Sequence, residues 1–301
     1  MLEARAFEPG FLRRLDGLVL GVQRARTVRE GRRPLGRVQG LGIEPESYKE
    51  YTEGDDLRFL DWNAFARLDD LTVRTFRVER EVEVTILVDA SASMGLPRED
   101  DKLGLALALG ASLAYVAMAS NDAVRLGAFA TSRGTVRLDT STLHRRRETY
   151  PDFRGFVESV RAAGTTRMAE GIGRLLLERR PAGMVVLISD FLVSAGEYEQ
   201  ALSSLLRARH EVKVVHVLGD REASGSYPPG HYRVRDSETG DLYEVTIGAH
   251  TAEICRSRAE RLSRQVATFC GAKGITYARA FGADNFDEIV MREFPRLGVI
   301  R

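Results

Sequence analysis

The sequence predicts an α/β protein with a doubly wound, mostly parallel sheet, an N-terminal helical and extended segment, and a β-hairpin insertion. Three observations support this prediction. Apolar strands alternate with helical stretches along most of the chain, which is typical of a parallel sheet with helices on both faces. The stretches at 81–89 and 181–191 contain continuous apolar runs, as expected for strands buried on both faces. Each run reaches an aspartate, and strand ends are where doubly wound sheets bind ligands.

The chain begins with segments that differ from the rest. An amphipathic helix is expected over 8–28, because Phe11, Leu15 and other apolar residues recur at helical spacing. The stretch 31–42 is rich in glycine and arginine and is predicted to be a loop. Residues 48–80 then mix aromatic, acidic and arginine side chains densely.

The remaining segments follow the alternation of strand and helix. Strands are expected near 81–89, 122–130, 135–140, 181–191, 211–219 and 275–281, and helices near 102–119, 150–162, 167–180, 197–209, 251–272 and 285–294. The segment 221–247 departs from this order, because two short alternating runs flank a turn at 237–241 and so predict a hairpin. We therefore expect an N-terminal part over 1–80 and an α/β domain with this hairpin over 81–301.

Composition and charge exclude several classes of protein. The chain has 44 Lys and Arg against 43 Asp and Glu, so its net charge of +1 produces no whole-molecule field that would attract nucleic acid or an anionic membrane, which leaves only local patches open. The first residues contain no apolar stretch typical of a signal peptide, and the apolar runs are shorter than the roughly 20 residues of a membrane span. Cys255 and Cys270 lie too far apart on one expected helix to pair with each other. We expect a cytoplasmic protein with reduced cysteines, no nucleic-acid partner and no membrane insertion.

The ends of the predicted strands carry a set of oxygen-bearing side chains. Asp89, Ser91 and Ser93 form the pattern D-x-S-x-S, Thr166 lies in a glycine-containing loop, and Asp190 follows another strand. Two carboxylates and three hydroxyls without histidine or cysteine favour Mg²⁺ or Mn²⁺ over Zn²⁺. Mostly neutral ligands would leave the ion electron-poor, with a position open for a carboxylate of another protein. The pattern thus predicts binding of an acidic partner, while helix caps, turns or a degenerate metal-free site remain the alternatives.

The order of these three segments resembles the von Willebrand factor A domain and its metal-ion-dependent adhesion site. On that resemblance Asp89, Ser91, Ser93, Thr166 and Asp190 match the five metal-site positions. The sequence Gly-Thr-Thr-Arg stands where that family commonly has Gly-Gly-Thr-Asn. Thr166 is chosen over its neighbour because of the Met-Ala-Glu-Gly-Ile that follows.

A second resemblance lies upstream, in GLGIEPESYKEYTEGDDLRFLDWNAFARLDDLTVRTFRVERE. This segment is similar to the hallmark of a bacterial family, domain of unknown function 58 (DUF58). The matching residues are Tyr51, Gly54, Asp55, Asp56, Arg58, Asp61, Trp62, Ala66, Arg67, Leu71, Val73 and Arg74. The resemblance implies a MoxR-type AAA+ ATPase as partner and a role in assembly, maturation or metal insertion of other proteins. The residues themselves predict an ion-pair network around Trp62. The segment would then be either a structural brace or a partner-binding surface.

A non-enzymatic binding module is the function that these patterns favour. The alternative is a serine hydrolase, in which Ser93 acts with Asp190 and with His216 or His250 in the order Ser, Asp, His. Three features weigh against it: the turn follows the first convincing strand, Asp89 would have no role, and His216 lies in an apolar run. Phosphate-binding glycine motifs after a strand are absent from the sequence.

Overall fold

The structure is a computed structural model that describes residues 2–21, 45–53, 57, 60–68, 70–76, 82–132, 134–225, 227–248, 250–282 and 285–301. The chain forms two compact units. One unit combines Met1–Gly21 with Glu81–Arg301, and the other is Val22–Arg80. The N-terminal part expected over 1–80 is therefore divided between them, because its first residues pack with the α/β unit.

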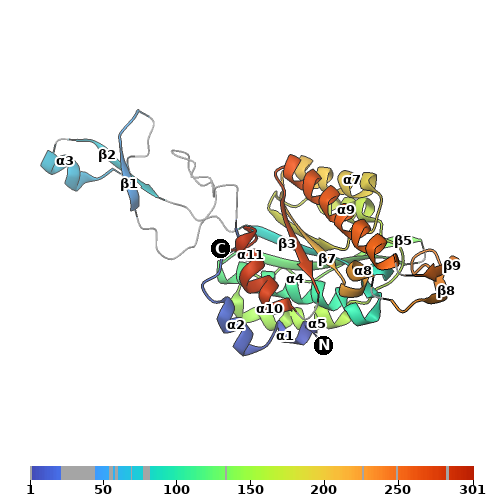
Figure 1. The fold of residues 1–301 in the computed structure, drawn as a ribbon. Helices are drawn as coiled ribbons and strands as arrows, with labels where there is room; N and C mark the ends of the chain where they lie inside the picture. Colours follow the sequence, from blue (N-terminus) through green and yellow to red (C-terminus); the bar gives the residue numbers. More distant parts are fainter. Residues whose placement is uncertain are drawn as a thin grey trace. The chain divides into compact units, whose positions relative to one another are not determined.

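A six-stranded sheet forms the centre of the α/β unit (Figure 1). Its strands are β3 (Glu83–Asp89), β4 (Ala123–Ser132), β5 (Thr135–Thr140), β6 (Met184–Ser189), β7 (Glu211–Leu218) and β10 (Thr276–Phe281). They lie in the order β10-β7-β6-β3-β4-β5, and all neighbours are parallel except β4 and β5. This confirms the mostly parallel α/β sheet. The chain moves from β3 outward to β5 and then returns to the other side of β3 with β6, so the strand order reverses between β3 and β6.

Helices cover both faces of the sheet. The helices of this unit are α1 (Leu2–Arg5), α2 (Pro9–Leu15), α4 (Lys102–Ala119), α5 (Phe153–Ser159), α6 (Met168–Leu177), α7 (Ala195–Arg207), α8 (Asp220–Ser224), α9 (Thr251–Ala272), α10 (Phe286–Glu288) and α11 (Phe294–Arg296). A π-helical turn, Ile289–Glu293, joins the last two, and 3₁₀ turns occupy Ala92–Gly95, Arg98–Asp100 and Arg147–Asp152.

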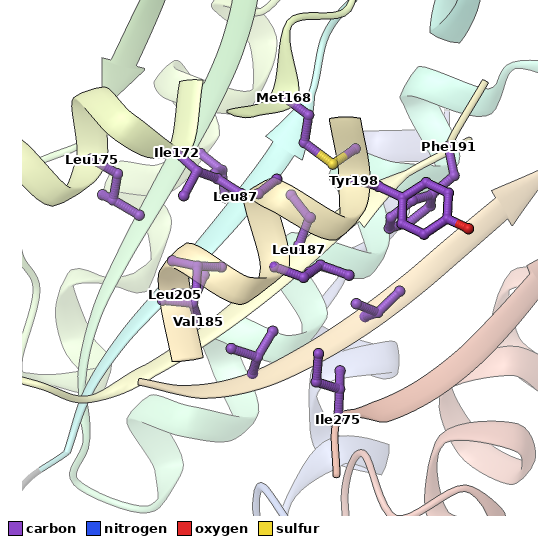
Figure 2. Packing of buried hydrophobic residues seen from close by; sticks show 14 of the residues in the cluster. Leu87, Met168, Ile172, Leu175, Val185, Leu187, Phe191, Tyr198, Leu205 and Ile275 are labelled. Carbon is purple, nitrogen blue, oxygen red and sulfur yellow. The ribbon is translucent and has the colours of Figure 1, made fainter. Parts of the chain in front are cut away.

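Alternate residues of the strands point to opposite faces and form two core layers. Leu87 of β3 and Leu187 of β6 pack with the apolar sides of α6, α7 and α9 in one cluster (Figure 2). On the other face, Ile86 and Ile188 approach Gly110 of α4, where a Cβ would lie 3.3 Å from Ile86. Both cysteines lie on α9 and are free, as expected.

The helical segment Arg98–Ala119, which contains α4, is long and apolar enough to cross a membrane by length and composition alone. However, 89% of its most apolar window is buried inside the protein. Its apolar residues run most of the way round because the sheet covers one side and α1 and α2 contact it elsewhere. The length and apolarity of α4 are therefore those of a central core helix.

The N-terminal helix is shorter than the sequence suggests. Instead of continuing over 8–28, α2 ends at Leu15, because Asp16 is extended and Gly17 adopts a left-handed φ of 87°. Leu20 then forms an antiparallel bridge with Ile300, so the two ends of the α/β unit pair. Residues 22–28 of the expected helix lie outside the described part of the chain.

Two smaller sheets complete the description. In the Val22–Arg80 unit, β1 (Pro45–Glu50) pairs antiparallel with β2 (Thr72–Phe76), and α3 (Trp62–Leu68) lies between them in sequence. In the α/β unit, β8 (Gly230–Arg235) and β9 (Leu242–Ile247) form a hairpin at the expected insertion. Figure 1 shows this hairpin projecting from one end of the unit, beyond α8.

Candidate metal-binding site

Three separate segments meet where the strand order reverses. Asp89 is the last residue of β3, and Asp190 directly follows β6, its neighbour in the sheet. The loop after β3 is bonded to the loop before α6, because the Ala92 amide donates to the Gly164 carbonyl at 2.9 Å and Ala163 donates to Ala90 at 2.8 Å. Parallel strands therefore bring the D-x-S-x-S turn, the threonine loop and the second aspartate to the same edge of the sheet.

Asp89 is fully buried, and both of its carboxylate oxygens accept hydrogen bonds. The amide of Ser91 donates to Oδ1 at 2.9 Å, and the hydroxyl of Ser189 donates to Oδ2 at 2.8 Å. Burial and then the nearby charge of Asp190 raise the pKa of Asp89 to about 7, although these hydrogen bonds act in the opposite direction. The carboxylate thus sits where negative charge is incompletely balanced.

The serine hydroxyls of the turn lie beside each other. Ser91 is fully buried and Ser93 is nearly so, and their Oγ atoms are 3.0 Å apart. This distance suits a hydrogen bond between the two hydroxyls. It also suits two neighbouring ligands of one octahedral Mg²⁺, because ligands at about 2.1 Å lie about 3.0 Å apart along an octahedral edge.

The backbone of the threonine loop is shaped by a glycine. Gly164 has a φ of 67°, and a Cβ there would lie 1.8 Å from the carbonyl oxygen of Thr131. The Thr131 hydroxyl donates to the carbonyl of Thr165 at 2.6 Å, which ties the loop to β4. Thr166 is buried, with 9% of its surface exposed. Its amide and hydroxyl both donate to the carboxylate of Glu238.

Asp190 is paired with a buried lysine. Lys102 Nζ donates to Asp190 Oδ2 and to Glu222 Oε2, both at 2.9 Å, and only 1% of the Lys102 side chain is exposed. Burial by itself lowers the pKa of Lys102, but the charges of Asp190 and Glu222 outweigh it and raise the pKa. The other oxygen of Asp190 accepts the amide of Leu192 at 3.2 Å.

Sequence reasoning missed four residues of this neighbourhood: Lys102, Ser189, Glu222 and Glu238. Lys102 had a signal, since it is the single charged side chain of the apolar helix α4, and a charge in a buried helix needs a partner. Ser189 directly precedes Asp190, which was a weaker signal in the sequence. Glu222 and Glu238 carried none that a local pattern could reveal.

The residues present fit a hard divalent cation. Asp190 and partly buried Glu222 pair with Lys102, and Asp89 lies close enough to Asp190 for that charge to raise its pKa. The three carboxylates therefore carry two more negative charges than Lys102 balances when all are ionised. The described residues contain no group of three or more His, Cys, Asp or Glu that could hold a metal, so any cation here depends on hydroxyl ligands. The hydroxyls of Ser91, Ser93 and Thr166 would hold it directly, with the two aspartates binding directly or through water.

The histidines lie away from the serine hydroxyls. His216 is buried, and its Nε2 donates to the Asp190 carbonyl at 3.0 Å while its Nδ1 accepts from Tyr277 at 2.9 Å. Burial lowers the pKa of His216 to about 4, so the ring is neutral. His250 is exposed beside Glu253, 3.9 Å away. The structure brings neither ring to Ser93, whose Oγ lies against Ser91.

The upstream motif is described only in part. Asp61 is buried, and its Oδ1 accepts the amides of Asn63 and Ala64 at 3.0 and 3.1 Å, which caps α3. The Trp62 side chain is 62% exposed. Arg67 is exposed, whereas four motif residues and one side chain lie outside the described residues: Gly54, Asp55, Asp56, Arg58 and the side chain of Arg74. The predicted ion-pair network stays a prediction.

A family comparison matches most of the chain. The model of the family described as "Protein of unknown function DUF58" matches residues 47–267. The chain belongs to the DUF58 family. This DUF58 protein is 30% identical over 238 residues to uncharacterised proteins of Mycobacterium bovis and Mycobacterium tuberculosis, covering 74% of this chain and 73% of each relative.

Solved structures offer more distant likenesses. The DUF58 chain is similar to the conserved hypothetical protein BatB of Bacteroides thetaiotaomicron, with 17% identity, a TM-score of 0.42, and coverage of 72% of this chain and 98% of that one. An aerotolerance-related membrane protein of Bacteroides fragilis follows with 15% identity, a TM-score of 0.38, and coverage of 71% and 99%. Similarity at this level assigns no function.

Proposed function

We propose that this DUF58 protein is a non-enzymatic, divalent-cation-dependent protein-interaction module with a von Willebrand factor A-like domain. The observation that carries the proposal is the cluster of hydroxyls and incompletely balanced carboxylates at the point where the strand order reverses. Ser91 and Ser93 supply neutral oxygens at the spacing of neighbouring octahedral ligands, and Asp89 supplies a buried carboxyl group beside them. A cation held there binds a carboxylate of a partner protein.

The chemistry of the ligands favours binding over catalysis. Neutral hydroxyl ligands neutralise less of the charge of the cation than carboxylates would, so the cation keeps its attraction for an outside acid. The ring nitrogens of His216 are engaged by Tyr277 and by a backbone carbonyl. Ser93 therefore has no general base in hydrogen-bond reach from that ring.

The proposed partner is a MoxR-type AAA+ ATPase, with which the protein works in the assembly or maturation of other proteins. Support for this partner comes from the resemblance of the segment around Asp61 and Trp62 to the DUF58 hallmark, together with the family match. An acidic side chain on the ATPase would supply the carboxylate.

Two measurements test the proposal. We expect Mg²⁺ to bind in calorimetric titration, and Ser91→Ala to weaken that binding by at least about tenfold because a direct ligand is lost. Ser112→Ala is the matched control, since Ser112 is equally buried but bonds only within α4. Capture of a MoxR-type ATPase by the immobilised protein should require Mg²⁺ and fail with EDTA. Capture that is unchanged by EDTA and by Ser91→Ala would contradict cation-mediated binding.

A further inference from the structure

The tip of the β8–β9 hairpin places a carboxylate on the candidate site. Glu238 Oε1 accepts the hydroxyl of Thr166 at 2.9 Å, and its Oε2 accepts the amide of the same residue at 3.2 Å. The two residues are 72 positions apart in the chain. Both oxygens of one acidic side chain are therefore directed at one of the proposed cation ligands.

The hairpin tip is built to present this side chain. Asp236 Oδ1 accepts the amides of Glu238 and Thr239 at 2.8 and 2.9 Å, and the Gly240 amide donates to the Asp236 carbonyl at 3.0 Å. Gly240 supplies the left-handed φ of 81° that closes the turn. Hydrogen bonds within the tip thus hold the backbone that carries Glu238, in addition to its contact with Thr166.

The tip is attached to the rest of the α/β unit mainly through that carboxylate. Within the described part of the chain, the hydrogen bonds from Asp236–Asp241 to residues outside the hairpin are the two to Thr166. The strands themselves are exposed along nearly their whole length. Displacing the tip from Thr166 would therefore break two described hydrogen bonds to the rest of the unit.

The contact has the geometry and the chemistry of the proposed recognition event. The 2.9 Å between Glu238 Oε1 and Thr166 Oγ1 matches the separation of about 3.0 Å between neighbouring ligands of an octahedral Mg²⁺. The ligand class is also the same, since the proposed function assigns a carboxylate to the open position. Glu238 thus places a carboxylate of this chain in hydrogen-bond contact with a proposed cation ligand.

We propose that Glu238 is an internal acidic ligand of the cation site, which a partner carboxylate must displace. This inference rests on the proposed function and adds the residue that closes the site at rest. Docking of Glu238 brings another negative charge toward Asp89 and Asp190, so a bound cation strengthens docking of the hairpin. By reciprocity, the docked hairpin strengthens binding of the cation.

Mn²⁺ provides the test, because water bound to it speeds the relaxation of solvent protons. Replacing Glu238 with alanine should open one coordination position to water, raise the relaxivity of bound Mn²⁺ and weaken Mn²⁺ binding on the order of tenfold. Sodium acetate should then lower the relaxivity of Glu238→Ala by displacing that water, and should affect the wild type much less. Glu244→Ala is the matched control, since Glu244 lies on the same hairpin with its side chain 83% exposed.

The possible results separate this inference from the proposed function. Suppose that the wild type binds Mn²⁺ and Ser91→Ala does not, but Glu238→Ala and Glu244→Ala have the same relaxivity, affinity and acetate response. That result overturns the role of Glu238 and leaves the proposed function standing. Absence of Mn²⁺ binding to the wild type overturns both. Thermal unfolding followed by circular dichroism should be the same for both hairpin variants, because neither side chain belongs to the core.

Discussion

At the scale of single residues, burial determines which groups near the sheet edge carry charge. Lys102 keeps its charge because Asp190 and Glu222 accept hydrogen bonds from its ammonium group, whereas burial and the charge of Asp190 raise the pKa of Asp89 to about 7. His216 shows the opposite shift, since burial lowers its pKa to about 4 and leaves a neutral ring between Tyr277 and the Asp190 carbonyl. Removing Lys102 would leave buried Asp190 and partly buried Glu222 without that cation.

The neutral state of His216 predicts a dependence of stability on pH. The folded pKa of about 4 lies below the ordinary value of 6.5, so the unfolded chain binds a proton first as the pH falls. The contribution of His216 to the free energy of unfolding is therefore complete above pH 6.5 and is lost as the pH falls toward 4. Between pH 7 and pH 5 the loss is on the order of 2 kcal/mol.

Urea unfolding of the wild type and of His216→Gln at both pH values measures this contribution. The stability advantage of the wild type over the variant should shrink at pH 5, because glutamine does not titrate. An equal advantage at both pH values would show that His216 is not held neutral. The difference between the two proteins removes the contributions of carboxylates such as Asp89, which titrate in the same range.

At the scale of structural elements, the site depends on how the loops after β3 and before α6 are held together. The Ala92 amide reaches the carbonyl of Gly164, whose φ of 67° allows the loop to pass Thr131 closely. Loops at the ends of parallel strands are positioned by the sheet, but their detailed course is set by such contacts. A glycine two positions before Thr166 therefore controls the proposed ligand.

Replacing Gly164 with alanine should destabilise the protein by about 2 kcal/mol and weaken Mg²⁺ binding, because the new Cβ would overlap the carbonyl of Thr131 in a left-handed backbone. Gly173→Ala is the control, since Gly173 is exposed on helix α6 with no atom near the added Cβ. That change should stabilise the protein by about 0.5 to 1 kcal/mol. Denaturant unfolding and calorimetry compare the two, and equal effects would refute the steric explanation.

At the scale of the whole molecule, the first 21 residues complete the α/β unit. Phe11 packs against Phe286 with ring centroids 4.9 Å apart, and Tyr150 donates to the carbonyl of Ala6 at 2.9 Å. The bridge between Leu20 and Ile300 then joins the N-terminal segment to the end of the chain. The contacts with Phe286 and Ile300 connect segments that are almost the full length of the chain apart.

The fully buried Leu15 of α2 tests this packing. Leu15→Ala should lower the free energy of unfolding by about 2 to 5 kcal/mol, because it opens a cavity beneath the N-terminal helix. Val19→Ala, whose side chain is 45% exposed, should change it by about 0.5 kcal/mol or less. Urea unfolding of the full chain measures both. A small effect of Leu15→Ala would mean that the N-terminal helix adds little to the stability of the unit.

Much of the fold follows from local patterns. The expected helix over 102–119 coincides with α4, and the strands expected over 81–89 and 181–191 contain β3 and β6, because periodicity and burial act over neighbouring residues. The prediction of a helix over 8–28 was wrong in length for a local reason too, since Gly17 follows Leu15, the last residue of α2, by two positions and adopts a left-handed φ.

Part of the candidate site can be predicted from the sequence, and part is determined only by the tertiary structure. Asp89, Ser91 and Ser93 form one contiguous motif, so their spacing alone indicates a common direction. The salt bridge of Lys102 with Glu222 and the contact of Glu238 with Thr166 depend on where the folded chain brings distant segments. Partners separated by so many residues leave no periodic signal, because proximity in a doubly wound sheet comes from strand order and not from sequence distance. The sequence by itself thus determines the motif, whereas only the tertiary structure determines the charge balance around it and the contact with Glu238.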